Sequence, residues 1–427
     1  MEIEFLKYII KDQKDKLLKT SPGIQRELTS KIENDLNLKE ISILLGVRRA
    51  GKSTLLKQVI QTLTHKTSEN NILYLNFEDE RLNGFTYLDF EKMHEAYLQL
   101  YNPKGRIFIF LDEIQEVKQW EKWAYRIREF ETAKLFVTGS NNSILKSEVS
   151  NALTGRNITY EEFPFSFKEI TPKTIDFYTQ QGIVQTRSLF EDYLNYGGFP
   201  EVFTQKRKDL LTLYLRDIIS RDMVSRYEIR NVKQFEEFTV YLLNLYSKKF
   251  TLSKLQHIFN LGSHNTVKNF ISYAENAYLV FTIENYSSSL SEVIRAPRKL
   301  YVIDHALAAQ FSNNPLADIG SKLENIVFIE LKRRLNSDEK IFFWQDGEQR
   351  EVDFIIKKGL KITKAIQVTY DLNRREVEVK NLVKALERFK LSEGTVITND
   401  YENTETIKNK KITFTPAWKW LLANQKP

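Results

Sequence analysis

The sequence contains no cysteine among its 427 residues. Without thiols the chain cannot form disulfides, cysteine-ligated zinc sites or iron–sulfur clusters. Histidine is nearly as scarce, and its five scattered positions speak against a histidine metal cluster: His65, His94, His257, His264 and His305. Any metal ion should therefore be held by carboxylates and phosphates, a ligand chemistry that suits Mg²⁺.

Long hydrophobic runs are also lacking. No stretch approaches the about 18 apolar residues that a membrane-spanning helix requires. The opening segment MEIEFLKYIIKDQKDKLLK lacks the pattern of a secretory signal, because charged residues interrupt its short apolar run. We therefore expect a soluble, cytoplasmic protein without a membrane partner.

The residues that are present favour globular domains. Hydrophobic residues make up 42% of the chain and aromatic residues 12%, which is enough for buried cores. A chain of 427 residues predicts about two to four domains. The net charge of +7 permits nucleic-acid binding but does not require it, since a mildly basic surface also serves solubility.

From Glu40 onward, short apolar runs alternate with amphipathic helical patterns. The runs are ISILLG, NILYLNF, RIFIFLDEI and KLFVTGS, and the helices that follow them are KSTLLKQVIQTL, YLDFEKMHEAYLQLY, WEKWAYRIREFE and NSILKSEV. Fully apolar strands between helices indicate a parallel sheet covered on both faces. Right-handed crossovers make such a sheet doubly wound, so the predicted fold class is α/β.

The segment GVRRAGKS, residues 46–53, fits the P-loop pattern G-x-x-x-x-G-K-[ST]. Its glycines allow a tight turn whose N–H groups point at a phosphate, and the following helix adds its positive end. Lys52 should reach the β- and γ-phosphates of ATP, and Ser53 should offer its hydroxyl to Mg²⁺. The predicted nucleotide-binding residues are Gly46, Arg48, Arg49, Ala50, Gly51, Lys52, Ser53 and Thr54. The side chains of Arg48 and Arg49 are free to face a partner, a neighbouring subunit or solvent.

The apolar run IFIFLDEI supplies the acids that a phosphate loop needs. Asp112 would stand at the carboxyl end of the strand and help to hold Mg²⁺, and Glu113 would act as general base for the attacking water. The next run ends in KLFVTGSNNS, where Ser140 or Asn141 could contact the γ-phosphate or instead cap a helix. Arg156, in ALTGR, could stabilise charge at a γ-phosphate or lie at the surface.

Seven motifs in a fixed order resemble a bacterial and archaeal family of AAA+-like ATPases: GVRRAGKSTLL, FLDEIQ, VTGSNNSIL, LTGR, FPFSFKEI, YGGFPEVF and RKLYVIDHAL. The resemblance implies a P-loop ATPase core, a winged-helix segment and a C-terminal α/β domain of the restriction-endonuclease-like type, and we expect the helix-rich stretch after the core to form a helical lid. It implies ATP hydrolysis by Lys52, Ser53, Asp112 and Glu113, and a role for Arg156 in its own subunit or in a neighbour. The domains we expect are N-terminal helices (1–36), the ATPase core (37–170), the helical lid (171–245), the winged-helix segment (246–315) and the nuclease-like domain (316–427).

Residues 251–283 fit a helix, a turn, a second helix and a strand, and resemble a winged helix. One face of the first helix carries Leu252, Leu255, Ile258 and Phe259. We expect Gly262 to close that helix and Ser263 to cap the second. The second helix would bury Val267, Phe270 and Ile271. In a DNA-binding protein His264, Asn265 and Lys268 would approach the nucleic acid. A winged helix used only for packing against protein is the alternative.

The C-terminal resemblance places Glu324 on a helix and Asp353 on a strand, at positions for metal ligands. Gln367 and Thr369 stand where the resemblance expects a glutamate and a lysine. Neither replaces an anionic ligand or an ammonium group, so we expect a degenerate binding or scaffolding domain. A lysine displaced to the next helix, Lys380 or Lys384, is the conceivable source of the missing ammonium group.

The sequence thus predicts an ATP-dependent oligomeric machine that couples ATP and ADP states to a winged-helix and a nuclease-like domain, with DNA as a candidate partner and a homo-oligomer as the expected assembly. An ATP-gated, metal-dependent nuclease and a nucleotide-bound scaffold without turnover are the alternatives.

Overall fold

The computed structural model describes residues 1–130, 132–142, 155–312, 319–371, 373 and 375–423. It divides into two compact units, Met1–Phe163 and Pro164–Pro427, which we describe separately. Most of the helix predicted for NSILKSEV falls outside the described residues.

The first unit contains the predicted parallel sheet. Its strand order is β2-β3-β4-β1-β5, and every neighbouring pair is parallel. The non-sequential order requires crossovers through helices, which confirms the doubly wound α/β class. The strands are β1 (Ile41–Leu45), β2 (Ile72–Asn76), β3 (Ile107–Asp112), β4 (Ala133–Gly139) and β5 (Asn157–Glu161).

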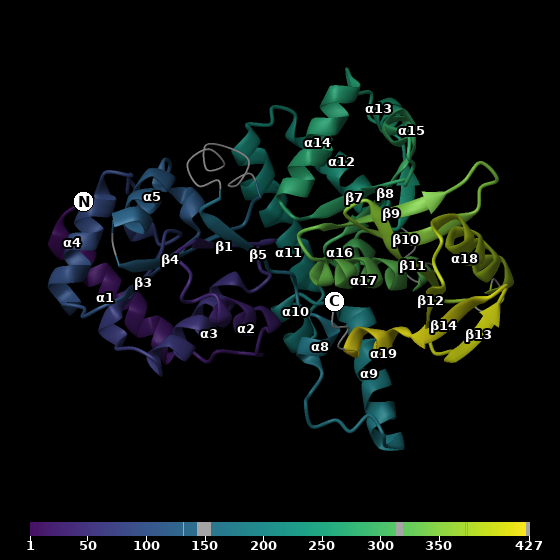
Figure 1. The fold of residues 1–427 in the computed structure, drawn as a ribbon. Helices are drawn as coiled ribbons and strands as arrows, with labels where there is room; N and C mark the ends of the chain where they lie inside the picture. Colours follow the sequence, from purple (N-terminus) through teal and green to yellow (C-terminus); the bar gives the residue numbers. More distant parts are fainter. Residues whose placement is uncertain (131, 143–154, 313–318, 372, 374, 424–427) are drawn as a thin grey trace. The chain divides into compact units, whose positions relative to one another are not determined.

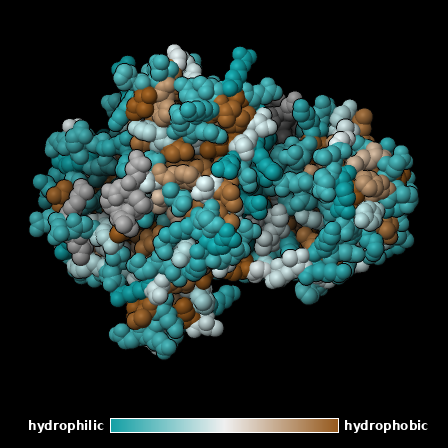
Figure 2. Space-filling model, turned by 180° about the vertical axis from the view of Figure 1, so that it is seen from behind, coloured by the Kyte–Doolittle hydropathy of each residue, from teal (hydrophilic) through white to brown (hydrophobic). Residues whose placement is uncertain are grey.

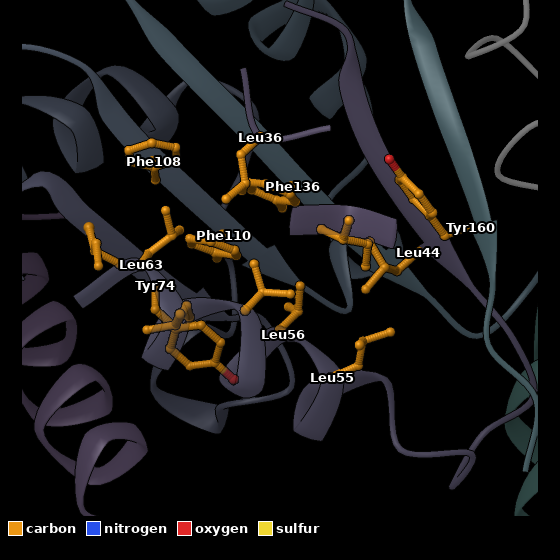
Figure 3. Packing of buried hydrophobic residues seen from close by; sticks show 14 residues of the cluster. Leu36, Leu44, Leu55, Leu56, Leu63, Tyr74, Phe108, Phe110, Phe136 and Tyr160 are labelled. Carbon is orange, nitrogen blue, oxygen red and sulfur yellow. The ribbon is translucent and has the colours of Figure 1, made fainter. Parts of the chain in front are cut away.

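Strand periodicity assigns the side chains of this sheet to two buried faces. Even-numbered residues such as Leu44, Phe110 and Phe136 pack against helix α3 (Lys52–Thr64), and the rings of Phe110 and Phe136 stack with centroids 4.5 Å apart (Figure 3). The opposite face is covered in part by α5, which contacts β4. The other helical elements of this unit are α1 (Ile3–Lys19), α2 (Glu27–Asn34), α4 (Asp89–Tyr101), α5 (Trp120–Phe130) and the short turns η1 (Glu69–Asn71), η2 (Glu80–Leu82) and η3 (Ile114–Glu116).

The two N-terminal helices belong to the same core as the sheet. Ile32 of α2 and the following Leu36 are buried against α3, and Leu17 of α1 packs on the same cluster. The connecting segment is fastened by Gln58 of α3, whose Nε2 donates to the carbonyls of Pro22 and Ile24 at 2.8 Å each. This connection brings residues before the P-loop into contact with its helix.

The second unit begins with helices. A capping box at Ser166 and Glu169 opens the first of them, because each side chain bonds the backbone N–H of the other residue. The helices before the next sheet are α8 (Phe167–Ile170), α9 (Gln180–Tyr196), α10 (Pro200–Gln205), α11 (Asp209–Asp217), its π-helical continuation η4 (Ile218–Ser225) and α12 (Val232–Asn244) (Figure 1).

A three-stranded sheet of order β6-β8-β7 follows, together with a pair of helices. Ser263 caps the second helix as predicted, accepting from the Thr266 N–H at 3.2 Å. Asn260, in the left-handed region at φ 46°, rather than Gly262, follows the first helix. The elements are β6 (Lys248–Phe250), α13 (Leu252–Ile258), α14 (His264–Asn276), β7 (Val280–Glu284), α15 (Leu290–Arg295), β8 (Arg298–Val302) and α16 (His305–Gln310).

The burial of these two helices follows the predicted pattern only in part. Leu255, Val267 and Ile271 are buried, whereas Ile258, which was expected on the buried face, is 45% exposed. Phe270 is half-buried, with its ring edge-on to that of Phe238.

The C-terminal part forms a mixed six-stranded sheet of order β13-β14-β12-β11-β10-β9. Strand β10 runs antiparallel to its neighbours β9 and β11. Strands β11, β12 and β14 run parallel, and β13 and β14 form an antiparallel hairpin. Helix α18 packs on this sheet through Leu382 and Leu386. The elements are α17 (Ile319–Arg334), β9 (Glu339–Gln345), β10 (Glu351–Lys358), β11 (Lys361–Thr369), α18 (Arg375–Phe389), β12 (Glu393–Thr398), β13 (Asn403–Ile407), β14 (Lys410–Pro416) and α19 (Ala417–Leu422).

Among the described helices, none combines the length and the hydrophobicity needed to cross a lipid bilayer. On the face drawn in Figure 2, hydrophobic residues lie in several separate places among hydrophilic ones.

Candidate nucleotide site and C-terminal cavity

The loop between β1 and α3 has the geometry that its glycines predict. Gly51 has φ 105° and Gly46 φ 155°, both in the region that glycine tolerates. A Cβ on Gly46 would overlap the carbonyl oxygen of Glu162, so this position has no room for any side chain. The loop therefore packs directly on the chain segment that follows β5.

Lys52 is buried at the first turn of α3. Its Nζ donates to the carbonyl oxygens of Gly46 at 3.1 Å and Val47 at 3.3 Å, and lies 3.7 Å from Oε1 of Glu113. The predicted base and the predicted phosphate-binding lysine thus occupy one site. The carbonyl groups of the loop and the Glu113 carboxylate compensate the buried ammonium charge.

Asp112 lies at the carboxyl end of β3 and is fully buried. Its pKa is raised by burial and by the neighbouring Glu113, and hydrogen bonds from Thr138, Ser53 and Tyr74 oppose that shift. The Tyr74 hydroxyl donates to Oδ2 at 3.0 Å, and the Thr138 hydroxyl donates to Oδ1. The predicted metal residues Ser53 and Asp112 therefore meet, and their donor atoms are the oxygens that Mg²⁺ prefers.

Glu113 adopts a left-handed conformation with φ 52°, which is uncommon for a residue other than glycine. Its backbone N–H donates to Oγ1 of Thr138 at 2.9 Å, and the side chain accepts from Gln115. The unusual backbone turns the chain directly after the strand, so that the Glu113 carboxylate faces Lys52.

Three residues that the sequence analysis did not single out complete the site. Tyr74 and Thr138 share the even-numbered face with Asp112 on adjacent strands, so strand register was the signal that could have found them. Arg26 precedes α2, and its guanidinium donates to the carbonyl of Ala50 at 2.9 Å while pairing with Glu162. No local pattern marks Arg26, because its partners lie far along the chain.

The other predicted residues are placed as follows. Ser140 and Asn141 are both fully buried directly after β4, at the same edge of the sheet as Asp112. Arg48 pairs with Glu78, and Arg49 has φ 69°. Thr54 lies in the first turn of α3, as the motif requires.

Arg156 is not brought to Lys52 within one chain. It precedes β5, and its carbonyl accepts from the N–H of Ile41, the first residue of β1. Strands β1 and β5 run parallel, and the loop follows the carboxyl end of β1. Arg156 therefore lies at the amino ends of these strands, one strand length of about 13 Å from the carboxyl ends where the loop begins. Its guanidinium stands 5.1 Å from the ring centroid of Tyr125.

The C-terminal residues line a cavity of about 760 Å³ in the second unit. Glu324 of α17 and Asp353 of β10 meet there, as the resemblance implies. Gln367 and Thr369 lie on the same strand face: Gln367 donates to Glu378, and the Thr369 hydroxyl donates to the carbonyl of Asp371 at 3.1 Å.

The ammonium group that lies between Glu324 and Asp353 comes from a residue that was not predicted. Lys299 of β8 donates to Asp353 at 2.8 Å. By contrast, Lys380 is exposed, and Lys384 pairs with Glu387 of its own helix at 3.2 Å. Neither Lys380 nor Lys384 is among the residues that line the cavity.

Three family descriptions match the chain. Residues 38–171 match an AAA domain, residues 187–318 a domain of unknown function (DUF8612) and residues 319–420 a second domain of unknown function (DUF4143). An uncharacterized protein of Haemophilus influenzae is 28% identical over 395 residues, covering 88% of this chain and 94% of that protein.

Among solved structures, the Orc1 protein of Aeropyrum pernix in complex with DNA is similar at 14% identity and a TM-score of 0.32, over 70% of this chain and 96% of that one. AMPPCP-bound DnaA of Aquifex aeolicus is similar at 15% identity and a TM-score of 0.25, over 58% and 86% of the two chains.

The uncharacterized protein MJ1544 of Methanocaldococcus jannaschii is 32% identical over 417 residues, covering 92% of this chain and 91% of that protein. The chain belongs to the same family as MJ1544, with an AAA domain at residues 38–171.

Proposed function

We propose that the protein is an Mg²⁺-dependent ATPase of the AAA+ type, which acts as a cytoplasmic homo-oligomer and couples its nucleotide state to the second unit. The observation that carries this proposal is the meeting of Lys52, Asp112 and Glu113 at one edge of a parallel sheet. A glycine turn with a chance lysine would not bring a buried carboxylate pair to the same place.

The residues of the chain divide the chemistry of hydrolysis among them. Lys52 would exchange its carbonyl contacts for the β- and γ-phosphates of ATP. Glu113 would take the proton of the attacking water, which forms the new bond to the γ-phosphorus as the bond to the ADP oxygen breaks. Ser53 and Asp112 would hold Mg²⁺, which when bound neutralises charge on the phosphates.

The first test compares single substitutions in the phosphate site. Lys52→Ala should lose ATP turnover, and Glu113→Gln should still bind ATP while losing turnover, because it keeps the shape of the base without its charge. Lys92→Ala, at an exposed lysine of α4, is the matched control and should behave like the parent. If Lys52→Ala hydrolyses ATP at the parental rate, the proposal is wrong.

We propose DNA as the candidate partner of the second unit. His264, Asn265 and Lys268 are all exposed at the start of α14, where a winged helix would meet nucleic acid. ATP turnover should be measured with single- and double-stranded DNA over a range of protein concentrations. Stimulation by DNA supports a DNA-directed machine, whereas bound nucleotide that never turns over supports a scaffold.

The alternative of an ATP-gated nuclease has a specific observation against it. The cavity that would cleave DNA already holds the ammonium of Lys299 between its carboxylates. DNA cleavage that requires a divalent ion and is lost in Asp353→Ala would revive this alternative.

A further inference from the structure

The cavity of the C-terminal part is organised around a buried lysine. The Nζ of Lys299 lies 2.8 Å from carboxylate oxygens of Glu324, Glu351 and Asp353, and the side chain is 4% exposed. Lys299 belongs to β8 of the three-stranded sheet, whereas its three partners belong to α17 and β10 (Figure 1). One side chain of β8 therefore pairs with acidic groups of both α17 and β10.

The electrostatics of the cluster favour a charged ammonium. A buried charge is tolerated when it is paired and hydrogen-bonded, and the carboxyl groups of Asp353, Glu351 and Glu324 each place an oxygen beside this one.

The backbone that follows Lys299 along β8 is fixed. Two residues further along β8, the Tyr301 hydroxyl donates to Glu324 at 2.7 Å and its ring stacks on Phe328 with centroids 4.1 Å apart. The Asn325 side chain bonds both the N–H and the carbonyl of Val302, at 2.8 and 2.9 Å. The ammonium is thus delivered by a strand that α17 holds in register, rather than by a mobile surface residue.

A divalent ion does not fit this site while Lys299 is in place. The resemblance assigns a metal ion to Glu324 and Asp353, but the oxygens that would bind it already surround Nζ. Among the described residues, no group of three or more histidine, aspartate or glutamate side chains has the spacing of a metal site.

We propose that Lys299 is a permanent internal cation that takes the place of a divalent metal ion in the C-terminal cavity. The cavity is then a metal-independent site, and its carboxylates bind β8 to the C-terminal sheet instead of activating water. This inference is independent of the proposed ATPase activity, because every residue in it lies in the second unit.

The test removes the ammonium and asks whether a metal ion replaces it. The full-length Lys299→Met protein is titrated with Mn²⁺ in the absence of nucleotide, and binding is followed by electron paramagnetic resonance. The variant should bind one more Mn²⁺ ion than the parent. Its affinity for this ion should be at least about tenfold higher than any affinity of the parent at this cavity. Adding Asp353→Asn to Lys299→Met should abolish the extra site. Lys364→Met, at an exposed lysine of β11, is the matched control and should gain no site.

Two results would overturn the proposal. One is a parent protein that already binds an Mn²⁺ ion which Asp353→Asn removes. The other is a folded Lys299→Met protein that gains no Mn²⁺. If Lys299→Met does not fold, the double variant Lys299→Met with Glu351→Gln is tested instead, because it removes one charge of each sign and keeps Glu324 and Asp353. A gain of one Mn²⁺ ion by the double variant supports the proposal, and no gain by the folded double variant overturns it.

Discussion

At the scale of single residues, Arg26 connects three parts of the first unit. Its guanidinium donates to the carbonyls of Ala50 and Phe163 and pairs with Glu162, and both charged side chains are 2% exposed. Removing one partner of a buried pair leaves an uncompensated charge in the interior. The loop carbonyl of Ala50 would lose a hydrogen bond in the same step.

Arg26→Met should therefore destabilise the protein by about 3–5 kcal/mol, measured by denaturant unfolding of the full-length chain. Changing both partners, Arg26→Met with Glu162→Leu, should cost less than the single change, because no unpaired charge remains. An equal or larger loss in the double variant would show that packing, rather than charge, dominates at this position.

Thr138 connects the predicted metal ligand Asp112 and the predicted general base Glu113 through one hydroxyl. That hydroxyl donates to Asp112 and accepts from the Glu113 N–H at 2.9 Å. Thr138→Val keeps the shape and removes both bonds, so ATP turnover should fall about 10- to 100-fold, with a shifted Mg²⁺ dependence as the sign of a positioning role. Thr159→Val, at an exposed threonine of β5, is the control. Unchanged turnover and Mg²⁺ dependence in Thr138→Val would contradict the assignment.

At the scale of elements, the contact between α17 and β8 gives a pH-dependent stability. Burial and the neighbouring Asp353 raise the pKa of Glu324 to about 8, from an ordinary value of 4.5. A carboxyl whose pKa is raised on folding stabilises the folded state fully at pH below 4.5, and that contribution is lost as the pH rises toward 8.

Glu324→Gln resembles the protonated acid and cannot ionise. Its unfolding temperature should stay within about 2 °C of the parent near pH 4, where the parental acid is protonated in the folded and unfolded states. It should exceed that of the parent at pH 7, because the variant does not lose the contribution of Glu324 between about pH 5 and 8. Asp353→Asn should instead lower the unfolding temperature, because Asp353 pairs with Lys299 and accepts from the Val368 N–H at 3.0 Å. A parental pH profile in Glu324→Gln would show that another group titrates.

The elements that could be predicted are those whose sequence signal lies within a short stretch of the chain. The run RIFIFLDEI and the P-loop turn form the expected strand and loop, because their signals lie within about ten residues. Arg26, Tyr74 and Thr138 were missed because their roles depend on pairing between distant segments. Lys299 was missed for the same reason, since 54 positions separate it from Asp353.

At the scale of the whole molecule, Arg156 decides whether one chain completes its own site. Within a chain it lies at the edge of the sheet away from Lys52, so a catalytic guanidinium would have to act on a neighbouring subunit. We expect Arg156→Ala to lower turnover without unfolding the protein, with turnover per chain in the parent rising with concentration. Light scattering at the same concentrations gives the assembly state.

Mixing two inactive variants tests the arrangement directly. Lys52→Ala keeps its arginine, and Arg156→Ala keeps its phosphate site, so a mixed oligomer contains interfaces at which an intact Lys52 faces an intact Arg156. Turnover of the mixture should exceed the mean of the two separate proteins and should grow with total concentration. If the mixture gives only that mean while both variants assemble with the parent, Arg156 acts within its own chain or has no role in hydrolysis. As a control, Lys92→Ala is mixed with Lys52→Ala. This mixture measures how far turnover falls when active subunits are diluted with inactive ones.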